Sequence, residues 1–305
     1  MKYARIVEVN GYLPRTQLTN HDIATMVDTN DEWIQKRTGI IARHVAEPQE
    51  TTLDMAFQAC KPFMNHKIDM IIVGCFSQEN RMPSLASRLQ LALNKPNIPV
   101  IDLNAACSGF VYALSIANAM IKSGQCESIL VVGVDKNTNH VDWTDRSTCC
   151  LFGDGAGAVL VKADQNPGIL YTDIGSDPSF VEDLKIEKNI MGDEYIEMNG
   201  KKVYKAAVSC GQRLFQAALD KLQQLPDYTI FHQANKRIID AIVESFNVDE
   251  DKVSYAIKHH ANTSAASIPL AFQLALDEGR IHTGDHVFLA AFGAGFSWGS
   301  VLLQY

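Results

Sequence analysis

The sequence has no apolar run long enough to cross a membrane. A spanning helix needs about 20 consecutive apolar residues, whereas the longest run, around residues 129–134, has the length of a strand. Basic residues are also scarce, because 27 Lys and Arg stand against 35 Asp and Glu and leave a net charge of −8. A field of that sign repels nucleic acid and anionic membranes. We therefore expect neither as a partner, and an anionic ligand would have to meet a local basic patch.

Patterns typical of metal sites and disulfide frameworks are missing as well. The 9 histidines show no H-E-x-x-H spacing, and the 7 cysteines are odd in number and irregularly spaced. The adjacent pair Cys149-Cys150 has no C-x-x-C partner, so we expect it to pack in the core. Without a leader-like start, this cysteine usage predicts a reducing, cytoplasmic setting. We expect no metal ion.

The 305 residues, 47% of them hydrophobic, can bury a core larger than that of one compact unit. We expect strands at 4–9, 70–74, 100–103, 129–134, 228–231 and 253–257, a turn at 10–14, and helices at 20–27, 28–40, 52–64, 83–93, 110–123, 203–222, 236–246 and 268–278. Helices and strands alternate through the first half. This order predicts an α/β fold with a mainly parallel sheet covered on both faces.

A local echo indicates an internal duplication. Residues 152–161 (FGDGAGAVLV) resemble residues 292–303 (FGAGFSWGSVLL). A repeat at half the chain length predicts two similar halves, 1–165 and 166–305. Both glycine-rich segments lead into strand residues, so neither can present a helix N-terminus to a dinucleotide phosphate. We expect these glycines to permit close backbone approach instead.

Cys107 is the candidate nucleophile. It sits at the turn between the expected strand 100–103 and the helix that begins near Phe110, with the small residues Ser108 and Gly109 beside it. The first turn of a helix favours negative charge, so the pattern predicts a thiol that ionises easily. The alternative is a buried structural cysteine, which is common in apolar strand–helix units.

Two polar residues elsewhere are candidate partners. His232 follows an expected strand and precedes a helix, where α/β sheets place their chemistry, although it could simply cap the turn. Asn262 also precedes a helix, where asparagine often serves as N-cap. The loop 292–298 could offer backbone N–H groups to an oxyanion. Together these residues predict a Cys/His/Asn set for nucleophilic catalysis.

Six segments carry a resemblance to a known family. They are DTNDEWIQKRTGI (28–40), NAACSGF (104–110), FGDGAGA (152–158), HQANKRI (232–238), NTSAASIP (262–269) and AFGAGFSWGS (291–300). In this order the chain resembles β-ketoacyl-acyl-carrier-protein synthase III, a condensing enzyme of the thiolase superfamily. The resemblance implies a thiolase-like fold, with two similar α/β halves in αβαβα layers. Asn262 stands where thiolases have a second cysteine and elongating synthases a second histidine; the adjoining His259 and His260 are expected to be structural.

The resemblance also implies a reaction. Cys107 would take the acyl group of an acyl-CoA primer, and His232 and Asn262 would stabilise the enolate formed when a malonyl thioester loses CO₂. The donor would be malonyl carrier protein or malonyl-CoA, and the β-ketoacyl product would initiate fatty acid biosynthesis. CoA thioesters would be substrates, no cofactor would be needed, and the enzyme would be a homodimer joined at strand edges.

Further site residues follow from the resemblance. Trp33 and Arg146 would sandwich the adenine of CoA, Arg37 would lie near its phosphate, and Asn235 would also bind CoA. The other implied residues are the carrier-protein contacts Gln233, Ala234, Asn235, Lys236 and Arg237, and the oxyanion loop Gly293, Ala294 and Gly295, together with the Cys107 backbone N–H.

Three departures from the family bear on these roles. Ala294 replaces the middle glycine of the oxyanion loop and would be strained at a positive φ. Glu244 stands where carrier-dependent relatives often have lysine, which favours a specialised relative making a secondary metabolite or signal. Met82 replaces a pocket-lining aromatic and could admit a larger acyl group. A second, different alternative is a non-catalytic acyl-CoA-binding scaffold.

Overall fold

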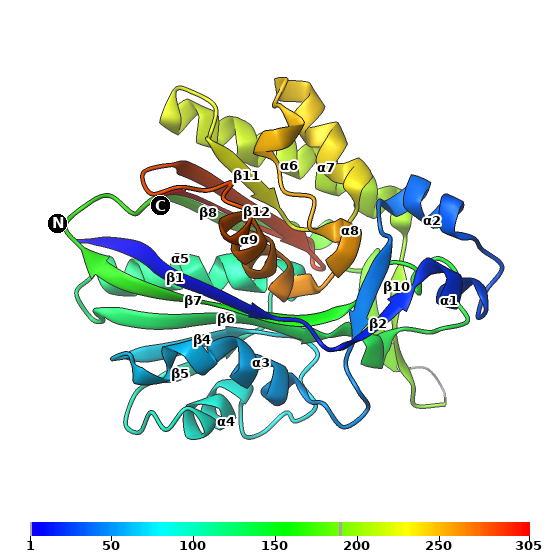
Figure 1. Cartoon of the computed structure of the whole chain (residues 1–305), viewed down its shortest axis with the longest axis horizontal. Helices are drawn as coiled ribbons and strands as arrows, with labels where there is room; N and C mark the ends of the chain where they lie inside the picture. Colours follow the sequence, from blue (N-terminus) through cyan, green and yellow to red (C-terminus); the bar gives the residue numbers. More distant parts are fainter. Residues whose placement is uncertain (1, 189–190) are drawn as a thin grey trace.

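The protein folds into five layers, alternating helices and sheets (Figure 1). The computed structural model describes residues 2–188 and 191–305. The strands are β1 (Tyr3–Tyr12), β2 (Thr16–Thr19), β3 (Ala42–Val45), β4 (Met70–Gly74), β5 (Val100–Leu103), β6 (Ser128–Lys136), β7 (Asp154–Asp164), β8 (Ile169–Ser176), β9 (Leu184–Lys188), β10 (Glu194–Met198), β11 (Tyr228–Phe231), β12 (His286–Gly293) and β13 (Ser297–Gln304). The helices are α1 (Asn20–Ala24), α2 (Asp31–Thr38), α3 (Thr52–Cys60), α4 (Leu85–Ala92), α5 (Gly109–Lys122), α6 (Gly200–Leu222), α7 (Lys236–Val243), α8 (Ile257–His260) and α9 (Ser267–Asp277). Short 3₁₀ turns are η1 (Lys61–Asn65), η2 (Ala106–Ser108), η3 (Asn137–His140), η4 (Pro178–Phe180), η5 (Glu244–Phe246), η6 (Glu250–Lys252) and η7 (Ser264–Ala266).

The first sheet has the strand order β1-β7-β6-β4-β5. Strand β4 runs parallel to β5 and β6, but β7 runs antiparallel to both β1 and β6. The expectation of a mainly parallel sheet was therefore wrong. A parallel return requires a long crossover, usually a helix, whereas the chain between β6 and β7 forms only η3 and turns.

The second sheet has the order β11-β12-β13-β8. Only β11 and β12 are parallel, joined by a connection that includes α7 and α9. Helices α5 and α9 lie between the two sheets, α3 and α4 cover the first sheet, and α6 and α7 cover the second (Figure 1). The five strands of the first sheet come from residues 3–164 and the four of the second from 169–304.

Several expected boundaries differ from the structure. Strand β1 continues to Tyr12, because Asn10 and Gly11 pair with Ala158 and Gly157, so the turn at 10–14 was placed too early. The strand at 253–257 is absent: Val253 makes a single bridge to Thr229, and the chain then enters α8. Strand β5 was expected to be buried, yet it is a partly exposed edge strand. The hairpins β2–β3 and β9–β10 were not anticipated.

The glycine-rich segments permit close approach, as expected. A Cβ on Gly157 would lie 2.6 Å from the Pro269 side chain, where α9 packs on the first sheet. A Cβ on Gly293 would lie 2.8 Å from the Cys107 backbone nitrogen. The two segments are used differently, however: residues 152–161 lead directly into β7, whereas residues 292–303 form the β12–β13 hairpin.

Candidate active site

The three candidate catalytic residues line one cavity. It has a volume of about 1000 Å³, and Cys107, His232 and Asn262 all contribute to its wall. They come from distant parts of the sequence: η2, the end of β11 and the segment before η7. The fold therefore brings the predicted set together, with its members drawn from both sheets' connections.

Cys107 is held in a tight turn between β5 and α5. The residue before it, Ala106, has φ 46°, a left-handed conformation that costs energy for a residue with a Cβ. Gly293 packs directly against the Cys107 backbone, where any side chain would collide. The sulfur faces the cavity and is half-buried.

The expectation of an easily ionised sulfur was wrong. Burial raises the pKa of the Cys107 thiol to about 12, because the cavity wall replaces the water that would solvate a thiolate. Cys107 also lies in η2 rather than in the first turn of α5, which weakens the influence of the helix dipole. The free site therefore holds a thiol, whose proton must leave when the sulfur reacts.

His232 is a neutral, fixed imidazole. Burial lowers its pKa to about 3. Its Nδ1 lies 2.6 Å from Ser267 Oγ, at the start of α9, and its ring packs edge-on to Phe292. When the Ser267 hydroxyl donates to Nδ1, the hydrogen of the neutral ring is on Nε2. His232 can then donate from Nε2 without carrying a charge.

Asn262 is fixed through its backbone and its side-chain oxygen. Its backbone N–H donates to the Leu151 carbonyl over 3.0 Å, and Gly153 N–H donates to its carbonyl over 3.0 Å. Its Oδ1 accepts from Ser264 N–H at 2.9 Å. This contact orients the amide and leaves the Nδ2 hydrogens as donors. Asn262 does not cap α9, whose preceding residue is Ala266.

The oxyanion loop fits alanine at its middle position. Gly293 and Ala294 line the cavity, and Gly295 follows in the β12–β13 turn. Gly295 has φ 130°, whereas Ala294 is not among the residues with positive φ. The strain expected for Ala294 is therefore absent, and the glycine conformation falls on the next residue.

Apolar side chains of the β9–β10 hairpin form part of the cavity wall. Ile186 pairs with Ile196, and Leu184 with Met198, and all four line the cavity. Alternate residues of a strand share a face, so this hairpin turns one apolar face inward. Met82, in contrast, is 87% exposed and does not line the cavity of a single chain.

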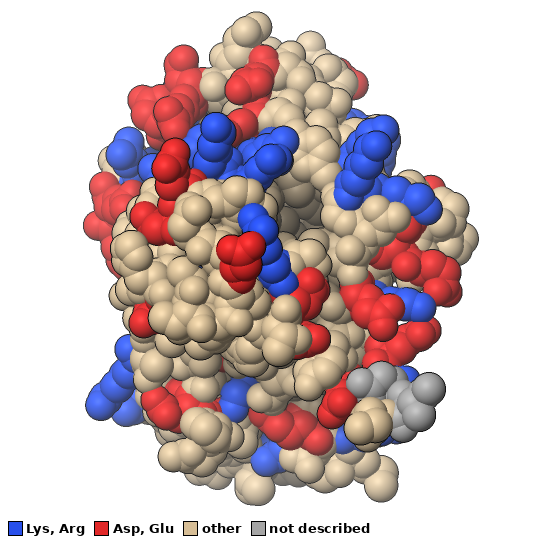
Figure 2. Space-filling view, turned by 90° about the vertical axis from the view of Figure 1, so that its right-hand side faces the viewer, with Lys and Arg blue, Asp and Glu red and all other residues tan. Residues whose placement is uncertain are grey.

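The cavity mouth is positively charged. Six cations line the cavity: Arg37, Arg81, Lys185, Lys201, Lys205 and Arg237. Figure 2 shows a hollow bordered by Lys and Arg side chains on this face of the molecule. Lys185 is paired with Glu182 and Glu187, but Arg37, Lys201, Lys205 and Arg237 form no ion pair within the described residues. The local patch required by the negative overall charge is thus present.

Trp33, Arg37 and Asn235 also border the cavity, and Arg146 lies beside it. Trp33 and Arg37 project from α2, and Asn235 caps α7 by accepting from Arg237 N–H at 2.9 Å. Arg146 stacks on Trp33, with its Cζ 4.2 Å from the ring centroid. Gly39, which ends α2 at φ 80°, packs against Lys236 and so places α2 next to α7.

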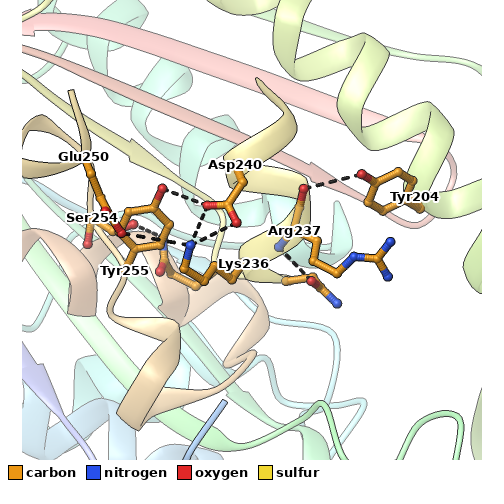
Figure 3. A network of polar contacts seen from close by, with 9 residues as sticks. Tyr204, Lys236, Arg237, Asp240, Glu250, Ser254 and Tyr255 are labelled. Carbon is orange, nitrogen blue, oxygen red and sulfur yellow. Dashed lines mark hydrogen bonds and ion pairs between the residues drawn. The ribbon is translucent and has the colours of Figure 1, made fainter. Parts of the chain in front are cut away.

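Two of the expected carrier-protein contacts are internal. Gln233 is 1% exposed, and its amide binds the carbonyls of Phe231 and Ser254. Figure 3 shows Lys236 Nζ between the two carboxylate oxygens of Asp240, at 2.8 and 2.9 Å. Lys236 also lies 4.6 Å from the Tyr255 ring centroid. Gln233 cannot touch a docked protein, and the charge of Lys236 is already balanced.

Arg237 is the available cation of this segment. Its side chain points away from the Lys236 network and lies over the Tyr204 ring, 5.5 Å from its centroid (Figure 3). It is exposed and borders the cavity, as does Ala234 beside it, which is partly buried. Lys201 and Lys205, on the first turns of α6, were missed because only the folded chain places them at the mouth. A run of lysines at a helix start resembles any solvated face in sequence.

The other features give no second site. Cys149 and Cys150 are buried, at 0% and 1% exposure, in an apolar cluster with Ile23 and Ile34, so the expected core packing is confirmed. Within the described residues no group of three or more His, Cys, Asp or Glu could hold a metal ion. In the same part of the chain, no helix is both long and apolar enough to traverse a bilayer.

Comparison with known proteins gives a consistent family. Residues 101–178 match the family described as 3-oxoacyl-[acyl-carrier-protein (ACP)] synthase III, and residues 221–305 match its C-terminal family. The chain is 44% identical to a β-ketoacyl-[acyl-carrier-protein] synthase III of Thioalkalivibrio sulfidiphilus, over 100% of both chains. It is 43% identical to synthase III 1 of Vibrio cholerae, over 99% of this chain and 100% of that one. The crystal structure of 3-oxoacyl-[acyl-carrier-protein] synthase III from Aquifex aeolicus superposes with a TM-score of 0.93 at 41% identity, covering 99% and 100% of the chains.

Proposed function

The chain belongs to the 3-oxoacyl-[acyl-carrier-protein] synthase III family, and on that premise we propose that Cys107, His232 and Asn262 carry out its reaction. The protein is an acyltransferase that catalyses the initiating condensation of fatty acid biosynthesis. Its fold is the thiolase-like fold of the solved family members, as the sequence predicted. The observation that carries the residue assignment is the single cavity that all three side chains line.

The first half-reaction transfers the primer to the enzyme. The Cys107 sulfur attacks the thioester carbonyl of an acyl-CoA, and the thiol proton of Cys107 ends on the departing CoA sulfur. The tetrahedral oxyanion would be met by backbone N–H groups of Cys107 and the Gly293–Gly295 turn. Since Gly293 packs against the Cys107 backbone, these groups are held in one rigid unit.

The second half-reaction makes the new carbon–carbon bond. The malonyl thioester loses CO₂, and its electrons pass into an enolate whose oxygen is bound by Nε2–H of His232 and Nδ2–H of Asn262. The enolate carbon attacks the acyl-Cys107 carbonyl, and the C–S bond breaks to release the β-ketoacyl product. Two neutral donors suit this step, because a positively charged imidazole would be costly in a buried site.

The test of this function is reconstitution. Purified enzyme given a panel of acyl-CoAs should gain the acyl mass, and malonyl carrier protein should then release CO₂, CoA and a β-ketoacyl product. An enzyme that stays unmodified across the panel and releases no CO₂ would contradict the proposal and favour a non-catalytic scaffold. The acylated species also identifies the primer directly.

We propose malonyl carrier protein as the donor, on the strength of the cavity mouth. Carrier proteins of this pathway are acidic, and four cations at the mouth, Arg37, Lys201, Lys205 and Arg237, are free of ion pairs within the described residues. Charge complementarity of this kind guides docking and increases the association rate. Glu244, which argued for a specialised enzyme, lies at the far end of α7 in η5 and does not line the cavity.

Arg237 and Lys236 should differ sharply despite being adjacent. We expect Arg237→Ala to raise the KM for malonyl carrier protein about five- to tenfold, and less at high salt, because its charge is free. Lys236→Ala is the matched control and should leave that KM unchanged, because Lys236 is paired with Asp240. Steady-state rates at two salt concentrations measure both. Equal effects of the two substitutions would contradict the assignment.

Trp33 should control CoA affinity. Arg146 rests directly on the Trp33 ring, whereas an adenine between them needs a separation of about 7 Å, so binding has to part the pair. We expect Trp33→Ala to raise the KM for acyl-CoA about tenfold with little change in kcat. Trp298, with Arg213 4.8 Å above its ring but outside the cavity wall, is the matched control. A KM unaffected by Trp33→Ala would remove it from the CoA site.

We propose that the enzyme is a homodimer joined along β5. This strand ends the first sheet, so its outer backbone groups are free to pair. Exposed apolar side chains lie on or near that edge: Ile101 at 40%, Leu91 at 82% and Met82 at 87%. A second copy would cover them, and Met82 would then shape the partner's acyl pocket. Sedimentation equilibrium should show a dimer for the wild type and a monomer for Ile101→Lys.

Three further expectations stand as proposals. The division of the chain near residue 165 is supported by the separation of the two sheets. A cytoplasmic location is supported by 7 unpaired cysteines. A reaction without metal or cofactor is supported by the mechanism above, in which thioester chemistry and decarboxylation need only hydrogen-bond donors and a thiol. Dialysis against a chelator should therefore leave the activity unchanged.

A further inference from the structure

Cys107 has a polar neighbour that the proposed mechanism does not use. Ser264 Oγ, in η7, lies 3.4 Å from Cys107 Sγ, within hydrogen-bond range for sulfur. Its hydroxyl approaches the sulfur from the cavity wall, 157 positions further along the chain. No feature of the sequence pointed to this contact, since Ser264 reads as part of the helix start after Asn262.

Ser264 is held in a costly conformation. Its φ is 53°, in the left-handed region, although it is not a glycine. Its N–H donates to Asn262 Oδ1 at 2.9 Å, and the next N–H, of Ala265, donates to Asp135 Oδ2 at 3.1 Å. These contacts fix the strained residue from both sides. Non-glycine residues at positive φ thus flank the sulfur on two segments, Ala106 and Ser264.

Asp135 is the buried anchor of this loop. It lies on β6 at 0% exposure and accepts from Phe76 N–H, Ser77 N–H, the Ser77 hydroxyl and Ala265 N–H. A hydrogen bond from the Ser264 side chain also acts on its carboxyl group, against the burial that raises its pKa. Gly133, two residues earlier on the same strand face, lets η7 approach, since a Cβ there would lie 2.3 Å from the Ala265 carbonyl.

A hydroxyl has one hydrogen and can donate in one direction at a time. While Cys107 is a thiol, the S–H can donate to Ser264 Oγ, and Ser264 can donate to the Asp135 carboxyl group. When the sulfur becomes negative, the Ser264 hydrogen can turn towards Sγ. The geometry therefore offers Sγ a donor that is available only when charge appears on it.

We propose that Ser264, held by Asp135, is a catalytic residue that stabilises negative charge on the Cys107 sulfur. The inference rests on the proposed function of Cys107 and adds a step to it. The charge appears twice: when the thiol proton leaves during acylation, and when the C–S bond breaks as the β-ketoacyl product is released. In both cases Ser264 donates a hydrogen bond and no bond to oxygen is formed or broken, so Ser264 ends each turnover unchanged.

The test uses alkylation of Cys107 by iodoacetamide, which reports the thiolate without any substrate. The other titratable groups around the sulfur are Asp135 on β6, and His232 and His140 across the cavity. We expect Ser264→Ala to lower the alkylation rate about 10- to 100-fold at each pH between about 6 and 10, because a hydrogen bond to a charged group is lost. Product release from acyl-Cys107, followed in single turnovers, should slow by a similar factor.

Two further variants separate chemistry from folding. Ser264→Gly also lacks the hydroxyl but accepts φ 53° without strain, so it should match Ser264→Ala in rate and exceed it in thermal stability. Ser77→Ala removes one donor to Asp135 without touching the sulfur and should leave the alkylation profile in place. Asp135→Asn is not used, because an amide hydrogen would face the N–H groups that the carboxylate now accepts.

The outcomes are distinct. Unchanged alkylation and release rates in folded Ser264→Ala and Ser264→Gly would overturn the role of Ser264, while acylation of the wild type by acyl-CoA would leave the proposed function standing. Conversely, a wild-type enzyme that is alkylated at Cys107 but never acylated would refute the proposed function, and a lowered alkylation rate in Ser264→Ala would still establish the hydrogen bond.

Discussion

The Cys107→Ala variant should form no acyl-enzyme and lose condensation by a factor on the order of 10⁶. Removing a covalent nucleophile has consequences of this size because no other group can split the reaction into two steps. Among the described residues that line the cavity, Cys107 is the only cysteine. The substitution removes a half-buried sulfur without introducing a larger group, so the fold should persist.

Intact-protein mass spectrometry after incubation with acyl-CoA measures this result. Cys126→Ala is the matched control, since Cys126 is a free, buried cysteine outside the cavity and its loss should leave the acyl adduct in place. An adduct on Cys107→Ala would show that acyl transfer uses another group. An adduct missing from both variants would indicate a folding defect, which circular dichroism would reveal.

The same variant should separate the two half-reactions. His232 and Asn262 are fixed by Ser267, Leu151 and Ser264, none of which depends on the Cys107 side chain for position. Cys107→Ala should therefore still decarboxylate the malonyl thioester slowly, releasing CO₂ without a condensation product. Measured CO₂ without β-ketoacyl product would assign the sulfur to acyl transfer and bond formation, and the other pair to decarboxylation.

The sequence allowed the catalytic set to be predicted because its members sit next to recognisable turns. Cys107 lies between an apolar strand and a helix, and His232 directly follows the strand Tyr228–Phe231, which the structure confirms. Asn262 was identified correctly as a candidate although the strand expected before it does not exist. Position in a turn depends on local patterns, which periodicity can show.

Properties set by the folded surroundings could not be predicted in this way. The raised pKa of Cys107 follows from burial by residues of both halves, which no local pattern records. The neutralised charge of Lys236 depends on Asp240, one turn along α7, and on Tyr255 from another segment (Figure 3). The reversed direction of β7 depends on a connection that lacks a helix. Such features arise from tertiary contacts, and these same contacts tune the site.

His232→Ala and Asn262→Ala should each lower the decarboxylation and condensation rates about 10²- to 10³-fold, because each removes one of two donors to the enolate oxygen. Acylation of Cys107 by acyl-CoA should persist in Asn262→Ala, since Asn262 is assigned only to the malonyl step. The loss should appear in kcat more than in KM, because the hydrogen bonds strengthen as the enolate forms.

The pH dependence of the wild type provides a second measure of the same pair. The pKa of His232 lies near 3 in the folded enzyme, so the imidazole stays neutral, and the decarboxylation rate should show no loss from His232 as the pH falls from 7 to about 4. The sign for stability agrees: the lowered pKa means that the unfolded chain takes up a proton first, near its ordinary value of about 6.5, so stability declines below that pH. His259→Ala is the matched control, since His259 is exposed, lies outside the cavity and should leave the rates unchanged. A wild-type rate that falls tenfold per pH unit below about 6.5 would mean that His232 is protonated there and would contradict its role as a neutral donor.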